Sequence, residues 1–192
     1  MRRVPAGSFE RLSSAGALWA AWMDFRRGKR RHPNVASFEL DADRAIFALQ
    51  RRLASGGYRP SPYRLKLVRD PKTRLIASSP VGDRVVQTAL VNEIGPAYER
   101  SFIDQSYACR TGRGPHRAVL AYLQATRRHR YRLSLDIRRY FASIDHARLL
   151  GLFARRLHDR DTLALLALLL RAGGQVYRSP LAVQALGAEP TP

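Results

Sequence analysis

The stretch YRLKLVRDPKTRLIASSPVGDRVVQTALVNEIG (Tyr63–Gly95) decides the fold, because a hairpin pattern passes directly into a helical pattern. Leu65 and Leu67 alternate with basic side chains, and Asp70–Thr73 (DPKT) has the composition of a tight turn. Extended structure is expected to resume over residues 74–77. We therefore predict a β-hairpin. The basic side chains on or near it are Lys66, Lys72 and Arg74.

Helices are predicted on both sides of the hairpin. Before it, Asp41 or Asp43 can cap a helix whose apolar residues recur at helical spacing and which stops at Gly56. After it, Asp83 can cap a helix that ends near Gly95. Helices are therefore expected to surround the hairpin.

Further elements are predicted at both ends of the chain. The segment GKRRHPN (Gly28–Asn34) is typical of an exposed basic loop. Ser143 or Asp145 can cap one helix, and Asp161 opens a leucine-rich helix that Gly173-Gly174 ends. The tail that follows is expected to be weakly structured.

Tyr131–Ile137 (YRLSLDI) has the clearest strand pattern in the chain, since apolar residues alternate with Arg132, Ser134 and Asp136. Asp136 then lies on the polar face, at the end of the strand and within a basic segment. Packing gives no reason for an acidic residue there. The pattern leaves two alternatives open, a surface ion pair with a nearby arginine and a metal site.

The chain is strongly basic. Its 192 residues include 34 Lys and Arg against 15 Asp and Glu, which gives a net charge of +19. Between Arg110 and Arg160 there are thirteen arginines and three acidic residues, so the excess is clustered. A high-GC genome explains arginine over lysine but not the shortage of acids. The charge therefore predicts binding to a polyanion such as nucleic acid.

The composition also excludes several classes of protein. A single cysteine, Cys109, excludes an internal disulfide and a multi-cysteine zinc site. The longest apolar run, Leu163–Leu170, is much shorter than the roughly 18–20 residues of a membrane span. The N-terminus lacks the apolar segment of a signal peptide. We expect a soluble, cytoplasmic protein with no membrane partner.

Four sequence blocks resemble blocks of the bacterial reverse transcriptases of the retron, group II intron and diversity-generating-retroelement lineage, and they occur in the same order as in that family. Phe38–Ile76 is similar to the leading helix and fingers hairpin of that family. Ser78–Ala118 is similar to the next two conserved blocks. Tyr131–Leu150 (YRLSLDIRRYFASIDHARLL) resembles the palm block that holds the first catalytic aspartate. The resemblance covers residues 38–170.

The resemblance implies roles for three residues of the palm block. Asp136 matches the catalytic, metal-binding aspartate, and Ile137 matches the residue whose carbonyl oxygen joins the same metal. Phe141 matches the aromatic steric gate that excludes a ribose 2′-OH. The implied cofactor is Mg²⁺, of which the complete enzyme uses two ions to activate the 3′-OH and to clamp the triphosphate.

The resemblance also implies roles for four basic residues. Lys72 and Arg74 lie where fingers residues clasp the triphosphate of the incoming dNTP. Arg84 matches the arginine of the adjoining block, and Arg113 matches a basic loop position near the template. The implied partners are therefore an RNA template, an RNA–DNA hybrid and a dNTP.

The chain departs from the family in its carboxylates. The family carries a second carboxylate pair in a Tyr-x-Asp-Asp hairpin, whereas this sequence has no adjacent Asp-Asp pair, and after Asp161 its only acid is Glu189. One aspartate cannot hold two metals, so Mg²⁺ would be incompletely liganded. We expect the chain to be inactive alone. Three alternatives stay open: a truncated chain, the product of a decayed gene, and one half of a split enzyme whose second polypeptide carries the rest of the palm and the thumb.

The sequence therefore predicts an α+β fold, with helices around a fingers β-hairpin and an incomplete polymerase palm sheet. The expected parts are a basic N-terminal extension (1–37), a fingers-like region (38–130), a partial palm (131–175) and a tail (176–192). The expected function is that of an RNA-directed DNA polymerase fragment. The alternative is a non-catalytic RNA-binding protein derived from a reverse transcriptase. A Tyr-x-Asp-Asp segment encoded downstream would favour the fragment.

Overall fold

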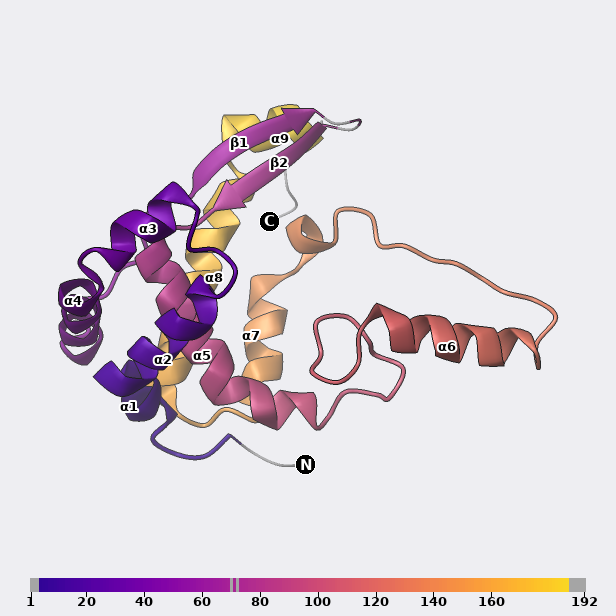
Figure 1. Ribbon diagram of the computed structural model, residues 1–192, viewed down its shortest axis with the longest axis horizontal. Helices are drawn as coiled ribbons and strands as arrows, with labels where there is room; N and C mark the ends of the chain where they lie inside the picture. The colour runs from indigo at the N-terminus through magenta and orange to yellow at the C-terminus, as the bar shows by residue number, and fades with distance from the viewer. Residues whose placement is uncertain (1–3, 70, 72, 187–192) are drawn as a thin grey trace.

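The computed structural model describes residues 4–69, 71 and 73–186. Over these residues the protein is α+β and mostly helical, with one two-stranded antiparallel sheet (Figure 1), which confirms the predicted class. In chain order the elements are α1 (Ser8–Ser13), α2 (Ala15–Arg26), α3 (Pro33–Glu39), α4 (Ala42–Ala54), β1 (Arg64–Arg69), β2 (Thr73–Ser78), α5 (Val81–Glu99), α6 (Pro115–Thr126), the 3₁₀ helix η1 (Tyr140–Ser143), α7 (His146–Ala154), α8 (Arg160–Tyr177) and α9 (Pro180–Leu186).

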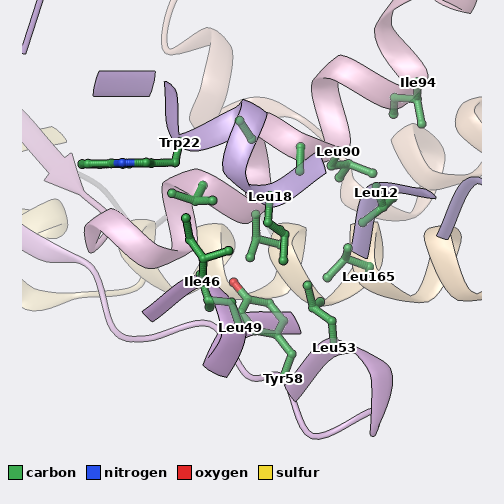
Figure 2. Packing of buried hydrophobic residues seen from close by; sticks show 14 of the residues in the cluster. Leu12, Leu18, Trp22, Ile46, Leu49, Leu53, Tyr58, Leu90, Ile94 and Leu165 are labelled. Carbon is green, nitrogen blue, oxygen red and sulfur yellow. The ribbon is translucent and has the colours of Figure 1, made fainter. Parts of the chain in front are cut away.

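The core forms around α5, against which α1, α2, α3 and α4 all pack. Val85, Val86 and Leu90 of α5 are buried. They meet Leu18 and Trp22 of α2, whose side chains have no exposed surface (Figure 2). Each such side chain contributes about 1.5–3 kcal/mol through the hydrophobic effect. The first helices therefore belong to the core, and the boundary expected after residue 37 falls inside α3.

A buried polar cluster joins the start of α1 to the start of α8. Asp159 Oδ2 accepts hydrogen bonds from Ser8 Oγ at 3.0 Å and from the N–H of Phe9 at 2.9 Å. Asp159 Oδ1 accepts from the N–H groups of Asp161 and Thr162, so Asp159 is the N-cap of α8. The predicted start at Asp161 was two residues late relative to this cap. Burial raises the pKa of Asp159, but the N–H donors outweigh it and leave that pKa below its usual value.

Two predicted helix ends are wrong, and packing explains one of them. α5 continues through Pro96 to Glu99, and α8 continues through Gly173 and Gly174 to Tyr177. A Cβ added at Gly174 would lie 2.9 Å from Cε1 of His146, at the start of α7. This glycine therefore allows α7 to lie close to α8 instead of ending the helix. The expected weakly structured tail contains α9.

The predicted hairpin is confirmed. β1 and β2 pair from Arg64 opposite Ser78 to Arg69 opposite Thr73. Half-buried leucines alternate with exposed basic residues along β1, and α9 packs against both strands (Figure 1). The hairpin is therefore held to the helical body through α8 and α9.

The predicted strand Tyr131–Ile137 is wrong. These residues form irregular chain, and all their side chains are exposed. Together with α6, which has no buried residue, they project from the helical body within a segment that we call the arm, residues 101–145 (Figure 1). A strand needs a neighbour for its N–H and C=O groups, and in the described part of the chain no strand pairs with this segment. The expected palm sheet is accordingly absent from the described residues.

Candidate nucleic-acid interface

One face of the hairpin presents basic side chains to solvent. The register places Lys66 opposite Ile76 and Arg74 opposite Val68, so Lys66 and Arg74 share a face with Arg64. All three basic residues are exposed. Within the described residues, neither Lys66 nor Arg74 has an ion-pair or hydrogen-bond partner among the side chains. Lys72, predicted beside them, lies outside the described residues.

Arg84 ties the end of β2 to the start of α5. Its Nε donates to the carbonyl oxygen of Ser79 at 3.0 Å, and its Nη2 donates to Ser78 Oγ. The guanidinium group also lies over the ring of Phe25, 5.6 Å from its centroid. Arg84 therefore has a structural role here, and its predicted contact with nucleic acid stays a prediction.

A buried carboxylate fixes the chain that leads into β1. Asp83 accepts a hydrogen bond from Tyr58 Oη at 2.7 Å and another from the N–H of Ser61 at 2.9 Å. Burial, and then the hydrogen bond to Asp83, raise the pKa of Tyr58 far above its usual range. The sequence pattern predicted Asp83 as a helix cap, but α5 has no side-chain cap. The true partners of Asp83 are more than twenty residues away, so no local pattern could have revealed them.

The arm contains arginines that are held by ion pairs. Arg113 donates to Asp104 Oδ1 at 2.7 Å, and Arg110 donates to Glu99 Oε1 at 2.6 Å. Both pairs fix the irregular loop before α6. The predicted template contact at Arg113 stays a prediction, because that side chain is already half-buried in an ion pair.

The residues that match the palm block lie together in the arm. Asp136 is exposed, Ile137 is 64% exposed, and Phe141 in η1 is 70% exposed with its ring 5.2 Å from that of Tyr140. Asp136 makes no hydrogen bond or ion pair within the described residues, so the ion-pair alternative is not realised there. No hydrogen bond or ring contact in the described chain joins Arg74 to Asp136 or Phe141. The described contacts therefore show no direct link between Arg74 and these palm-block residues.

The carboxylates of the described chain do not fit a two-metal centre. Two Mg²⁺ ions need several carboxylate oxygens besides those of the substrate. Among the described residues, no three His, Cys, Asp or Glu side chains are grouped so that they could hold a metal ion. Asp145 accepts the N–H of Arg148 at 2.9 Å as the cap of α7, and this bond keeps the pKa of Asp145 below its usual value. Within the described residues, Asp136 therefore belongs to no group of three or more side chains that could hold a metal ion.

Fold and surface together define a mostly helical α+β protein with an exposed basic hairpin. No protein-family profile matches the chain. Protein YkfC of Escherichia coli (strain K12) is 31% identical to it over 132 residues, which are 65% of this chain and 35% of that protein. The chain thus spans only about a third of the length of this relative. None of the helices described here has the length and apolar character needed to cross a membrane.

Proposed function

We propose that the chain is the nucleic-acid-binding, N-terminal part of a reverse-transcriptase-like protein and that it is catalytically incomplete alone. The β1–β2 hairpin carries the proposal. It lies in the block that resembles the fingers hairpin of that family, and it presents Arg64, Lys66 and Arg74 on one exposed face. No acidic side chain in the described chain neutralises Lys66 or Arg74.

The charge of the chain supports an RNA template or an RNA–DNA hybrid as the partner. A net charge of +19 on 192 residues favours phosphate contacts without sequence preference. Arginine dominates this charge, and its planar guanidinium group both binds phosphate through two parallel hydrogen bonds and stacks on bases. The arm carries many of the clustered arginines and so supplies further basic side chains.

The same hairpin is the proposed contact for the triphosphate of a dNTP. Arg74 is exposed on β2 and has unused donors within the described residues. A triphosphate that meets such a guanidinium group gains charge-assisted hydrogen bonds. In the proposed complete enzyme, Arg74 and Lys72 hold the triphosphate while Asp136 and Ile137 contribute to the metal site and Phe141 to sugar selection.

The arm supports the proposal of a missing partner segment. Leu133, Leu135 and Ile137 are exposed along a segment whose alternation is typical of a strand. Val119 and Leu120 of α6 are exposed as well. Several exposed apolar side chains within one segment are typical of an interaction site. We propose that the rest of the palm, on the same or a second polypeptide, covers it.

The alternative is an RNA-binding protein without catalysis. One observation favours it: the described residues hold no carboxylate cluster around Asp136. Both alternatives share the prediction of RNA binding and differ only in whether added palm segments produce activity.

RNA binding tests the shared proposal. The chain is expected to bind single-stranded RNA at low salt, with an affinity that falls steeply as salt rises, because bound counterions are released. Lys66→Gln together with Arg74→Gln should lower the slope of log affinity against log salt by about two, whereas Arg51→Gln on the exposed side of α4 should leave it nearly unchanged. An affinity that does not change with salt concentration, or no binding at low salt, would contradict the proposal.

A further inference from the structure

A pocket of about 660 Å³ lies where the basic loop Gly28–Asn34, α3, the start of β1 and the first turn of α5 meet. The basic side chains that line it come from three places in the chain: Lys29 and His32 from the loop, Arg64 from β1 and Arg84 from α5. Among the described residues that form its wall there is no Asp or Glu. The charged side chains in the wall of this pocket are therefore all basic.

Several hydrogen-bond donors in this pocket are unused. Arg64 makes one long bond, from Nη1 to Asn34 Oδ1 at 3.5 Å, out of the five that a guanidinium group can donate. The His32 side chain makes no hydrogen bond or ion pair in the described part of the chain, and it does not cap α3. Lys29 donates to the carbonyl oxygen of Phe25 at 2.9 Å and keeps two further N–H groups. An anion in the pocket can accept from all three side chains.

The acidic residues nearby face other partners. Glu39 pairs with Arg26 and Arg30, and the hydrogen bond from Arg30 is the main cause that lowers the pKa of Glu39. Asp83 is turned into the core toward Tyr58. Neither carboxylate neutralises the pocket. The first turn of α5, which has no side-chain cap, adds to the positive potential of Lys29, Arg64 and Arg84.

The aromatic rings of the pocket do not offer a free stacking face. Two cations already lie over the ring of Phe25: Lys29 Nζ is 5.0 Å and Arg84 Cζ is 5.6 Å from its centroid. Phe38 packs against Trp22 with ring centroids 4.7 Å apart. The pocket therefore suits an anionic group better than a nucleobase.

We propose that this pocket is a phosphate-binding site in which Arg64 and His32 hold the phosphate oxygens and Lys29 and Arg84 complete the positive wall. The phosphate belongs either to the nucleic acid that the proposed function requires or to a free phosphate compound such as pyrophosphate. Binding of a nucleic-acid phosphate rests on the proposed function, whereas binding of a free phosphate compound does not. The site lies at the foot of the hairpin and is distinct from the predicted contacts at Lys72 and Arg74.

Pyrophosphate is the probe for the site itself. Isothermal titration at low salt is expected to show binding to the wild-type chain, and at least about tenfold weaker binding to a variant with Arg64→Gln and His32→Gln, because charge-assisted hydrogen bonds are lost. Both side chains are exposed, and an unchanged melting temperature shows that the variant is folded. Arg51→Gln removes one positive charge from the exposed side of α4, outside the residues that line the pocket, and should leave the affinity within about twofold. Equal losses in the two variants, or no binding by the wild type, would overturn the proposal.

Competition identifies the source of the phosphate. If a nucleic-acid phosphate occupies the pocket, pyrophosphate will displace a short single-stranded RNA from the wild type, and the double variant will bind that RNA more weakly than the Arg51→Gln control. If only pyrophosphate binding falls in the double variant, the site is for free phosphate compounds. If the chain binds pyrophosphate but no RNA, the phosphate site stands and the proposed function fails.

Discussion

Asp83 shows how one side chain links two parts of the chain that local sequence keeps separate. Its carboxylate is 4% exposed, and it accepts from the Tyr58 hydroxyl and the Ser61 amide. A buried carboxylate is stable only when donors replace the water that it loses. The link therefore holds the segment before β1 against α5 and so helps to set where the hairpin begins.

Tyr58→Phe is expected to destabilise the protein by about 1–3 kcal/mol, because the substitution leaves one oxygen of the buried Asp83 carboxylate without its donor. Urea unfolding measures the change. Tyr63→Phe is the matched control, since the Tyr63 hydroxyl has only a 3.4 Å bond from Gln87 and its loss should cost less than about 0.5 kcal/mol. Equal effects of the two substitutions would contradict the assigned role of Asp83.

Asp159→Asn is expected to reveal a pH-dependent contribution to stability. The folded pKa of Asp159 lies below its ordinary value of 3.8, so its stabilising effect is present above that value and is lost as the pH falls through the folded pKa. At pH 7 the variant should be less stable by about 1 kcal/mol, because the amide accepts more weakly from the N–H of Phe9 and from Ser8. Unfolding at a series of pH values should show the difference closing in acid. A constant difference would contradict this assignment.

Among the elements, those defined by local chemistry were predictable and those defined by distant contacts were not. The hairpin follows from the alternation before Asp70 and the turn residues after it, and the cap at Asp145 is confirmed.

The end of α8 was missed because Gly174 allows close packing against His146, which no local pattern shows. Tyr131–Ile137 has a strand pattern without a partner strand in the described chain, and pattern alone cannot supply one. Of the candidate site, the exposed basic hairpin was predicted, whereas the pocket behind it was not.

The two adjacent glycines of α8 give a test at the scale of a helix. Gly173→Ala should stabilise the protein by up to about 1 kcal/mol, since alanine favours the helix and nothing lies within 4 Å of the new Cβ. Gly174→Ala gains the same propensity but places its Cβ 2.9 Å from His146 Cε1, so it should be clearly less stable than Gly173→Ala. Thermal unfolding compares them. In a His146→Ala background, Gly174→Ala should no longer be less stable than Gly173→Ala. If it still is, the contact with His146 is not the cause of the lost stability.

At the scale of the molecule, the helical body and the arm differ in how they are held. α5 is buried on several sides, whereas α6 has no buried residue and Leu133 and Leu135 are more than four-fifths exposed (Figure 1). Amide hydrogen exchange should therefore be much faster in α6 than in α5, because local opening of α6 exposes little additional apolar surface. Mass spectrometry of peptides from the two helices measures this difference. Equal protection would show that α6 is covered, for instance by a second copy of the chain.

Polymerase activity is expected to depend on carboxylates more than on the basic charge of the chain. With an RNA template, a DNA primer, dNTPs and Mg²⁺ or Mn²⁺, the 192-residue chain alone is expected to show no primer extension, because the described residues offer no group that could hold two metal ions around Asp136. RNA binding by the same preparation shows that it is folded. When a palm segment with a Tyr-x-Asp-Asp hairpin is fused or added, extension should appear.

In that restored enzyme, Asp136→Asn should abolish extension, since an amide carries no negative charge to bind the metal. Phe141→Ala should leave dNTP incorporation measurable and raise incorporation of ribonucleotides, because the smaller side chain no longer occupies the space beside the 2′ position. Extension by the chain alone that survives Asp136→Asn would show that the catalytic assignment is wrong. If added palm segments never produce activity while RNA binding persists, the non-catalytic RNA-binding alternative is the better description, since binding needs only the basic surface that the hairpin and arm already present.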